Sequence, residues 1–197
     1  MEQFRELSEN KTEKQNGKLK FFPDQATLLL NINERDLAFK ELENTALKKG
    51  LFRKEEVHLT LLGSKNGEAI LVKLNALPEE QKTSQLAKIK EIAETFSWKV
   101  VVKPECYYIS KKYNDPDPND LGKTIPETRE SIVQMLEVED LEEFYRAIRE
   151  FTGIDFDLPL SHATLYTNST RQDKRLRGIG IYSEKQFNEL NPEKITV

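Results

Sequence analysis

The chain has 197 residues, of which 37% are apolar and 32% are charged, a composition typical of a soluble domain with a hydrophobic core. Its net charge of −4 argues against binding to bulk duplex nucleic acid, and no apolar run reaches the roughly 18 residues that a membrane span needs. The single cysteine, Cys106, and a polar N-terminus without the apolar core of a signal peptide favour the cytoplasm.

Residues 1–20 are rich in Lys, Glu, Asn and Gln and predict a flexible polar leader. Residues 21–197 then form a single domain. From Ala26 to Ile32 the apolar run predicts a buried strand, and Asn33 is a candidate N-cap of a helix that ends before Gly50.

The next segments continue with a strand and two helices. In residues 56–63, the alternation of apolar and polar residues predicts a strand on which His58 and Thr60 share a face. The apolar run of residues 67–77 fits a helix or a strand, and we favour a helix. Residues 78–96 carry apolar residues at spacings of three and four, which predicts an amphipathic helix.

Pro104 divides an apolar region into two predicted strands, residues 98–102 and 106–110. Residues 114–126 are rich in Pro, Asp and Asn, and predict a loop that is a candidate lid. The Asp-rich part of this loop lacks the glycine and the terminal glutamate of a calcium loop, so we expect no metal there.

The second half repeats the order of the first. Residues 130–138 predict a strand, residues 141–151 an amphipathic helix that stops at Gly153, and residues 161–170 a strand. On this last strand His162, Thr164 and Tyr166 are expected on one face. A short segment, residues 177–183, and a helix over residues 184–190 follow. Strand, helix and His-x-Thr strand thus occur twice, which predicts a pseudo-duplicated α+β architecture.

The chain contains only two histidines, and each is followed two positions later by a threonine. With 13 threonines in 197 residues, chance gives this double coincidence about once in two hundred cases. A single strand histidine is more often a half-buried residue bonded to backbone, but two matched motifs favour a functional pair.

Phosphodiester cleavage needs such a set of groups. One base takes a proton from the attacking oxygen, one acid protonates the leaving oxygen, and further donors bind the remaining phosphate oxygens. Imidazole suits both proton roles near neutral pH. A threonine hydroxyl two residues along the same strand face, about 6.6 Å away, can bind the same phosphate.

With His58-Leu59-Thr60 and His162-Ala163-Thr164, the sequence resembles the two-histidine (2H) phosphoesterase superfamily over roughly residues 26–167. The resemblance implies a two-lobed fold in which antiparallel sheets line a central cleft with helices outside. It also implies that His58, Thr60, His162 and Thr164 are catalytic. The family includes RNA 2′,3′-cyclic phosphodiesterases, also called 2′-5′ RNA ligases. Its relatives often carry a bulkier apolar residue than Ala163 within the motif.

Further candidates for binding base or phosphate come from the strands beside the motifs. Tyr166 continues the predicted face of His162, although a strand aromatic is more often part of the core. Tyr108 and Lys112 share the face opposite Ile109, which is expected to be buried, and Arg171 and Lys174 follow the second motif.

The sequence therefore predicts a monomeric, metal-independent phosphodiesterase that needs no cofactor and opens a 2′,3′-cyclic phosphate or a 2′-5′ bond of RNA or a small nucleotide. Alternatives are an enzyme acting on cyclic oligonucleotide signals or RNA ends, and a catalytically silent nucleotide-binding module. A two-histidine zinc site is disfavoured because neither motif supplies a neighbouring ligand at the usual spacing.

Overall fold

The computed structural model of the chain describes residues 18–116, 120 and 122–196. It is an α+β structure in which all strands belong to one antiparallel sheet, with the order β1-β2-β4-β7-β6-β5-β8 and β3 paired to β7. The strands are β1 Leu19–Phe22, β2 Thr27–Asn31, β3 Phe52–Arg53, β4 His58–Leu62, β5 Val100–Pro116, β6 Thr124–Val138, β7 His162–Ser169 and β8 Glu193–Ile195. The helices are α1 Phe39–Lys48, α2 Ser64–Leu74, α3 Glu79–Glu94, α4 Leu141–Thr152 and α5 Glu184–Glu189, with short 3₁₀ helices η1 Pro23–Gln25, η2 Glu34–Asp36 and η3 Gln172–Lys174.

The two halves of the chain repeat one order of elements. Each begins with two adjacent antiparallel strands, continues through a helix, and ends with a strand whose first residue is a histidine. These halves give β1-β2-β4 on one side of the sheet and β7-β6-β5 on the other, so that their last strands meet in the middle. The pseudo-duplication that the sequence predicts is therefore present in the strand order.

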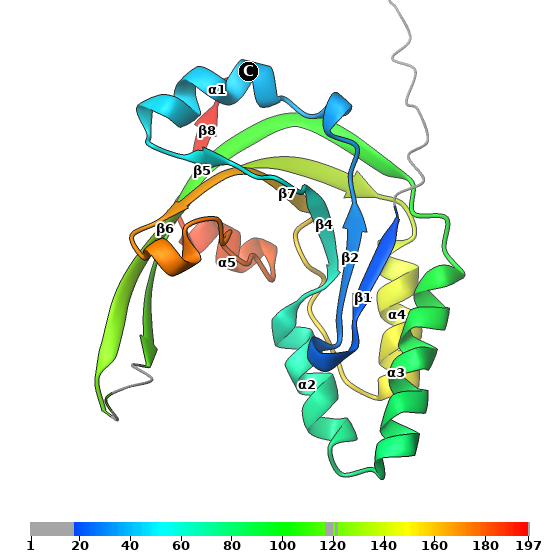
Figure 1. The fold of residues 1–197 in the computed structure, drawn as a ribbon. Coiled ribbons are helices and arrows are strands. Elements are labelled where there is room, and N and C mark those ends of the chain that lie inside the picture. The colour runs from blue at the N-terminus through cyan, green and yellow to red at the C-terminus, as the bar shows by residue number, and fades with distance from the viewer. Residues whose placement is uncertain (1–17, 117–119, 121, 197) are drawn as a thin grey trace, which may run out of the picture.

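The contact between the two half-sheets is narrow. Among the described residues, a single Cα pair, Leu59 with Ala163, joins β4 to β7. In contrast, β7 pairs with β6 from its first residue to its last. Both side chains of this pair are buried. Figure 1 shows the sheet bending strongly, so that the long β5–β6 hairpin lies on one side of the view and the β1–β2–β4 strands on the other.

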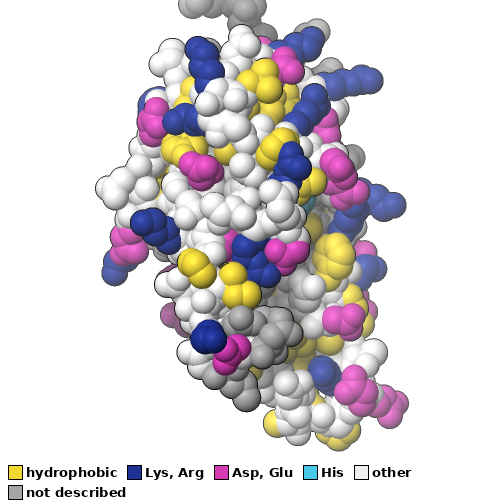
Figure 2. All heavy atoms as spheres, turned by 60° about the vertical axis from the view of Figure 1, so that its left-hand side comes forward, with side chains coloured by type: hydrophobic (Ala, Val, Ile, Leu, Met, Phe, Trp, Pro, Cys, Tyr) yellow, Lys and Arg dark blue, Asp and Glu magenta, His cyan; other side chains and the backbone are white. Residues whose placement is uncertain are grey.

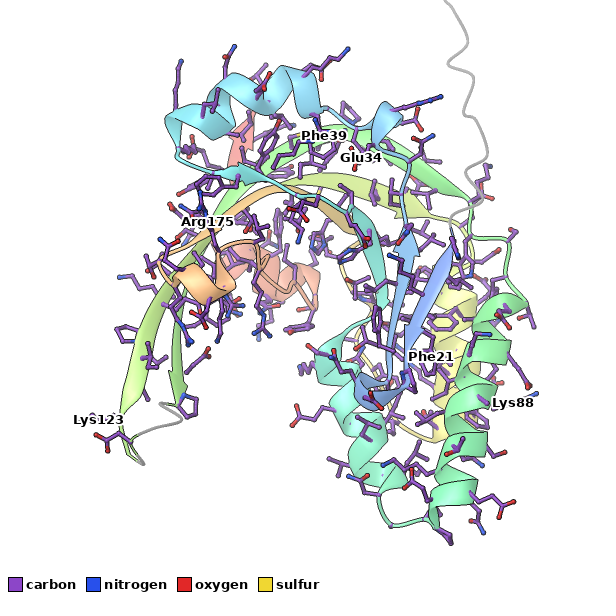
Figure 3. The ribbon with its side chains drawn as sticks, in the orientation of Figure 1. Phe21, Glu34, Phe39, Lys88, Lys123 and Arg175 are labelled. Atoms are coloured by element: carbon purple, nitrogen blue, oxygen red, sulfur yellow. The ribbon has the colours of Figure 1, made fainter. Side chains whose placement is uncertain are left out.

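Helices α1 and α4 each pack on the half-sheet of the other half of the chain. Phe39 of α1 makes an edge-to-face contact with Tyr166 of β7, with ring centroids 5.6 Å apart, and its carbonyl accepts a 2.9 Å hydrogen bond from the Tyr166 hydroxyl. In the same way, Tyr145 of α4 donates to the carbonyl of Leu61 in β4 over 3.0 Å. Figure 3 shows Phe39 beneath α1, pointing toward the sheet. The exchange of helices closes one main hydrophobic core across both half-sheets.

Most of the predicted elements are confirmed. The buried strand after Ala26 is β2, and Asn33 caps η2, a 3₁₀ turn before α1, by accepting a bond from the Arg35 amide. The segment that fits either a helix or a strand is the helix α2, where Gly67 passes so close to Gln25 that a Cβ would lie 2.1 Å from its carbonyl oxygen. The predicted helices over α3, α4 and α5 are present.

Two predictions around the β5–β6 hairpin are wrong. The two strands divided by Pro104 are one strand, β5, whose pairing with β6 shifts between Val102 and Cys106, so that the proline lies in the irregular part of the ladder. The loop predicted over residues 114–126 is shorter in the structure, because its first residues belong to β5 and its last residues to β6. Residues 117–119 and 121 lie outside the described residues.

The polar leader predicted over residues 1–20 is too long at its C-terminal end. Leu19 and Lys20, assigned to the leader, belong to β1, and residues 1–17 of that leader lie outside the described residues. The C-terminal strand β8, which pairs with β5, has no counterpart in the sequence analysis. In the described part of the chain, no helix combines the length and apolar character required to cross a membrane.

The narrow junction predicts a sensitivity to size at residue 163. Replacing Ala163, which is fully buried, with leucine should lower the free energy of unfolding by about 1 to 3 kcal/mol, because extra methylenes in a packed core force shifts of backbone and side chains. The measurement is urea denaturation of Ala163→Leu. Ala87→Leu on the exposed face of α3 is the matched control and should change the value by less than about 0.5 kcal/mol. Equal stability of the two variants would contradict tight packing at the junction.

Candidate active site

A cleft of about 490 Å³ lies at the junction of the half-sheets. Its wall includes all four residues of the two motifs, His58 and Thr60 from β4 and His162 and Thr164 from β7. The segment before α5, which contains Gly178 and Tyr182, also lines this cleft. The structure therefore brings together residues that are more than one hundred positions apart in the sequence.

The strand register explains this convergence. Because β4 and β7 are antiparallel and Leu59 pairs with Ala163, continuing the register by one residue in each direction sets His58 opposite Thr164 and Thr60 opposite His162. Successive side chains along a strand point to opposite faces of the sheet, so the residues on either side of Leu59 and Ala163 face away from that pair. The buried pair thus faces the core, and the four polar residues face the cleft. Each histidine lies across from the threonine of the other motif.

A backbone hydrogen bond fixes the orientation of His162. Its Nδ1 lies 2.8 Å from the carbonyl oxygen of Leu160. A carbonyl oxygen only accepts hydrogen bonds, so Nδ1 must carry a proton. In the neutral ring Nε2 is then the unprotonated nitrogen, available to accept a proton in the cleft.

Both histidines are held in the neutral form. Burial lowers the pKa of His58, and the nearby charges of Lys54 and His162 lower it further. Burial also lowers the pKa of His162, an effect partly opposed by its bond to the Leu160 carbonyl. Since both values lie below the ordinary histidine value, the unliganded site contains two neutral imidazoles at neutral pH.

Glycines leave space beside both threonines. A Cβ on Gly178 would lie 3.3 Å from Oγ1 of Thr164, and a Cβ on Gly63 would lie 3.4 Å from Cγ2 of Thr60. The backbone therefore passes close to each threonine in a related manner. At both positions a larger residue would crowd the threonine that faces the cleft.

The cleft is more positive than the protein as a whole. Four cations and two carboxylates line it, a net charge of +2, whereas the whole chain carries −4. The cations are Lys54, Lys111, Arg129 and Arg177, and the carboxylates are Glu56 and Asp115. Figure 2 shows basic and acidic side chains interspersed over the face that it presents, without one dominant sign. The positive excess is thus a local property that suits an anionic ligand.

A buried ion pair supports the wall on the side of β6. Arg129, which is 5% exposed, binds Glu127, which is 2% exposed, through two hydrogen bonds of 2.5 and 2.9 Å. Glu127 also accepts a 2.7 Å bond from the Ser169 hydroxyl. The bonds from Arg129 are the main reason that the pKa of Glu127 falls to about 2. The carboxylate stays charged, and the guanidinium is held in one orientation.

Tyr166 does not line the cleft, contrary to the prediction. Thr164 pairs with Val133 and Tyr166 with the next residue of β6, Ile132, so Leu165 is an extra residue in β7. Such a bulge reverses the alternation of faces. Tyr166 consequently packs in the core against Phe39, and the Leu165 carbonyl accepts a 2.9 Å bond from the Lys54 amide.

Tyr108 and Lys112 also lie away from the cleft. They share a face, as predicted, but it is the face that carries α1, where Tyr108 packs against Lys49 and donates to Glu130. The cleft wall is the face of Ile109, which is buried in a second cluster with Ile179, Ile181 and Phe187 from the C-terminal segment. The prediction had the correct alternation and the wrong face.

Arg171 and Lys174 lie at the edge of the site without lining it. Arg171 pairs with Asp173 over 2.6 Å and lies 3.6 Å from Asp115, and Lys174 also binds Asp115. These two cations neutralise a carboxylate of the cleft wall. Their role in the structure is to support the wall and not to contact its interior.

The sequence analysis missed most of the cationic and aromatic lining. Lys111 and Tyr113 are each one position from Lys112 and lie on the other face of β5. Arg129 lies one residue before the strand that was predicted over residues 130–138, although it belongs to β6 in the structure. Arg177 and Tyr182 belong to an irregular segment whose course no periodic pattern reveals. The described residues contain no group of three or more His, Cys, Asp and Glu side chains that could hold a metal ion.

The neutral histidines predict a specific pH behaviour. By NMR, His58 and His162 of the free protein should both titrate below the ordinary value of about 6.5, because burial disfavours the charged rings. The unfolded chain then binds protons more readily, so the free energy of unfolding should fall as pH drops below about 6.5 and should be fully retained above it.

Inorganic phosphate should raise at least one of these two pKa values, since an anion between the rings favours a proton there. His58→Asn, which removes one titrating ring, is the control that assigns the signals. A free-protein pKa above 6.5 for either ring would contradict the described environment.

Comparison with known proteins adds no relative to this description. No family model, no curated protein and no solved structure matches the chain.

Proposed function

We propose that the protein is a metal-independent phosphodiesterase that hydrolyses 2′,3′-cyclic phosphate or 2′-5′ phosphodiester bonds of RNA or small nucleotides. The observation that carries the proposal is the reciprocal arrangement of the two motifs around the Leu59–Ala163 pair. This arrangement brings two imidazoles and two hydroxyls to one cleft of positive charge. The set matches what phosphodiester hydrolysis needs, namely one acid, one base and phosphate donors.

The neutral state of the free site supports an ordered mechanism. An entering phosphate diester brings a negative charge, which favours uptake of one proton by the histidine pair. The protonated ring then donates to the leaving ribose oxygen, while the neutral ring takes a proton from the attacking water. After the reaction the proton has moved from one ring to the other. His162 takes part through Nε2, because its Nδ1 is bonded to Leu160.

The threonines supply the donors of this mechanism. Thr60 and Thr164 lie across the strands from the opposite histidines, so that each phosphate oxygen between the strands meets groups from both motifs. Their hydroxyls donate to the non-bridging oxygens, on which charge develops in the transition state. Lys54, close enough to His58 to lower its pKa, adds positive charge on the same side.

The strand order supports assigning the two-lobed 2H phosphoesterase fold to the chain. Two related half-sheets with helices outside meet at a cleft that contains both motifs. With this fold we propose a cytoplasmic monomer that acts on nucleotides or RNA ends and not on bulk duplex nucleic acid, without a cofactor. Cyclic oligonucleotide signals would use the same four residues.

A second candidate is a nucleotide-binding module without catalysis. The lowered pKa values of both histidines favour it, since the free site has no proton to give. The two candidates differ in what phosphate binding does to the rings. An enzyme needs one of them protonated in the complex.

The first test is turnover of a panel of 2′,3′-cyclic mononucleotides, 2′-5′ dinucleotides and cyclic dinucleotides in the presence of a chelator, with products separated by chromatography. His58→Ala and His162→Ala should each lower the rate about a hundred- to ten-thousandfold, the usual loss for a general acid or base. Circular dichroism verifies folding. Near wild-type rates in either variant would refute the assignment, and absence of wild-type turnover on the whole panel would leave the binding module.

The threonines provide the second test. Thr60→Val and Thr164→Val keep the β-branched shape and remove the donor, so each should lower the single-turnover rate by about a hundred- to a thousandfold. Ground-state binding of the nucleotide should weaken less, because the bond strengthens in the transition state. Thr124→Val, at the exposed start of β6, is the matched control. Full activity in both cleft variants would make the threonines structural.

A further inference from the structure

A second polar cluster lines the cleft away from the histidines, on β5 and β6. Lys111 and Tyr113 belong to β5 and Arg129 to β6, where Lys111 and Arg129 are paired in the antiparallel register. Residues of such a pair lie side by side on one face of the sheet. Arg177, from the segment before α5, completes the cluster.

The cluster lies along the same wall as the second motif. Thr164 pairs with Val133 of β6, and Arg129 is four residues further along that strand, about 13 Å at roughly 3.3 Å per residue. Val133 and Arg129 point to the same face, because their positions differ by an even number. The cleft therefore extends from the histidines along the β5–β6 hairpin in the direction of its tip, where Lys123 lies (Figure 3).

Charges within the cluster are not balanced. Asp115, which lines the cleft two residues after Tyr113, is paired with Lys174 and Arg171, and Glu127 is bound by Arg129. Within the described part of the chain, Lys111 and Arg177 make no ion pair. Burial lowers the pKa of Lys111, and the charge of Arg129 lowers it further. Arg129 is thus paired with a carboxylate, whereas Lys111 and Arg177 leave positive charge facing the cleft.

Tyr113 lies at the centre of these cations. The guanidinium of Arg129 stacks on its ring, 4.1 Å from the centroid, and the Lys111 ammonium lies 5.1 Å from it. Arg177 and Tyr182 are close enough to affect the pKa of the Tyr113 phenol, which burial raises. The arrangement offers a fixed guanidinium, two unpaired cations and a hydroxyl donor, which together suit a phosphate.

We propose that this cluster of Lys111, Tyr113, Arg129 and Arg177 is a second phosphate-binding subsite, and that the ligand is a short single-stranded oligonucleotide whose terminal phosphate lies between the histidines. This inference rests on the proposed function for its ligand class. A second phosphate of the same strand then lies against the subsite. Mononucleotides reach only the histidine end, so the subsite selects for ligands with more than one phosphate.

The test compares binding of two uridine ligands that contain neither a cyclic phosphate nor a 2′-5′ bond and are therefore not cleaved by the proposed reaction. These are uridine 3′-monophosphate and a uridine trinucleotide with a 3′-phosphate, measured by isothermal titration calorimetry. The wild-type protein should bind the trinucleotide at least about tenfold more tightly than the monophosphate.

The double variant Lys111→Gln/Arg177→Gln should bind the trinucleotide about tenfold or more weakly, the effect of removing a hydrogen bond to a charged group, and should bind the monophosphate within about twofold of the wild-type affinity. The slope of log affinity against log salt concentration should become shallower by about 0.7 for each cation removed that neutralises a phosphate. Lys112→Gln/Arg175→Gln is the matched control, since Lys112 neighbours Lys111 on the opposite strand face and Arg175 stacks on Phe52, outside the cleft lining. Thermal unfolding verifies that both double variants fold.

Three outcomes would overturn the subsite: a wild-type protein without preference for the trinucleotide, wild-type trinucleotide affinity in Lys111→Gln/Arg177→Gln, or an equal loss for both ligands. The control behaving like the cleft variant would overturn it as well. Because no turnover is measured, these results are independent of the enzymatic assay. A protein inactive on the whole panel that still shows the expected binding differences would refute the phosphodiesterase and retain the subsite.

Discussion

The pairing of Leu59 with Ala163 is the constraint on which the site depends. One antiparallel contact sets the register, and the register brings both motifs to the same face with each histidine across from the threonine of the other. A shift by one residue would turn a motif toward the core. Ala163 is small and fully buried at the point where the two half-sheets meet. The positions of the four motif side chains in the cleft thus follow from one buried apolar pair.

Electrostatics around this pair follow from the same geometry. Burial at the junction lowers the pKa of both histidines, while cations from β5, β6 and the segment before α5 give the cleft a positive charge within an acidic protein. Neutral rings cost less to bury than charged ones. An anion that enters such a cleft is attracted by the cations and in turn favours protonation of a ring. In the proposed enzyme, phosphate binding and protonation of one histidine are therefore coupled.

Alternation along the strands was sufficient to predict the two motifs, their shared faces and the helices that follow them. It failed where the ladder is irregular or where both faces are covered. Leu165 is an extra residue in β7, and this bulge turned Tyr166 into the core. On β5 the buried Ile109 marks the cleft side, because the C-terminal segment packs there, so Lys111 and not Lys112 lines the site. Neither the bulge at Leu165 nor the packing of the C-terminal segment on β5 leaves a periodic signal in the sequence.

The exchange of helices between the halves has a consequence for how the chain can reach this structure. The strands of the first half are covered by α4, which is made only after β5 and β6, and the strands of the second half are covered by α1. Each unit that repeats along the sequence thus completes its part of the core with a helix from the other unit. During synthesis the core of the first half lacks the contribution of α4 until about three quarters of the chain has been made, because α4 ends at Thr152, so its packing is completed late.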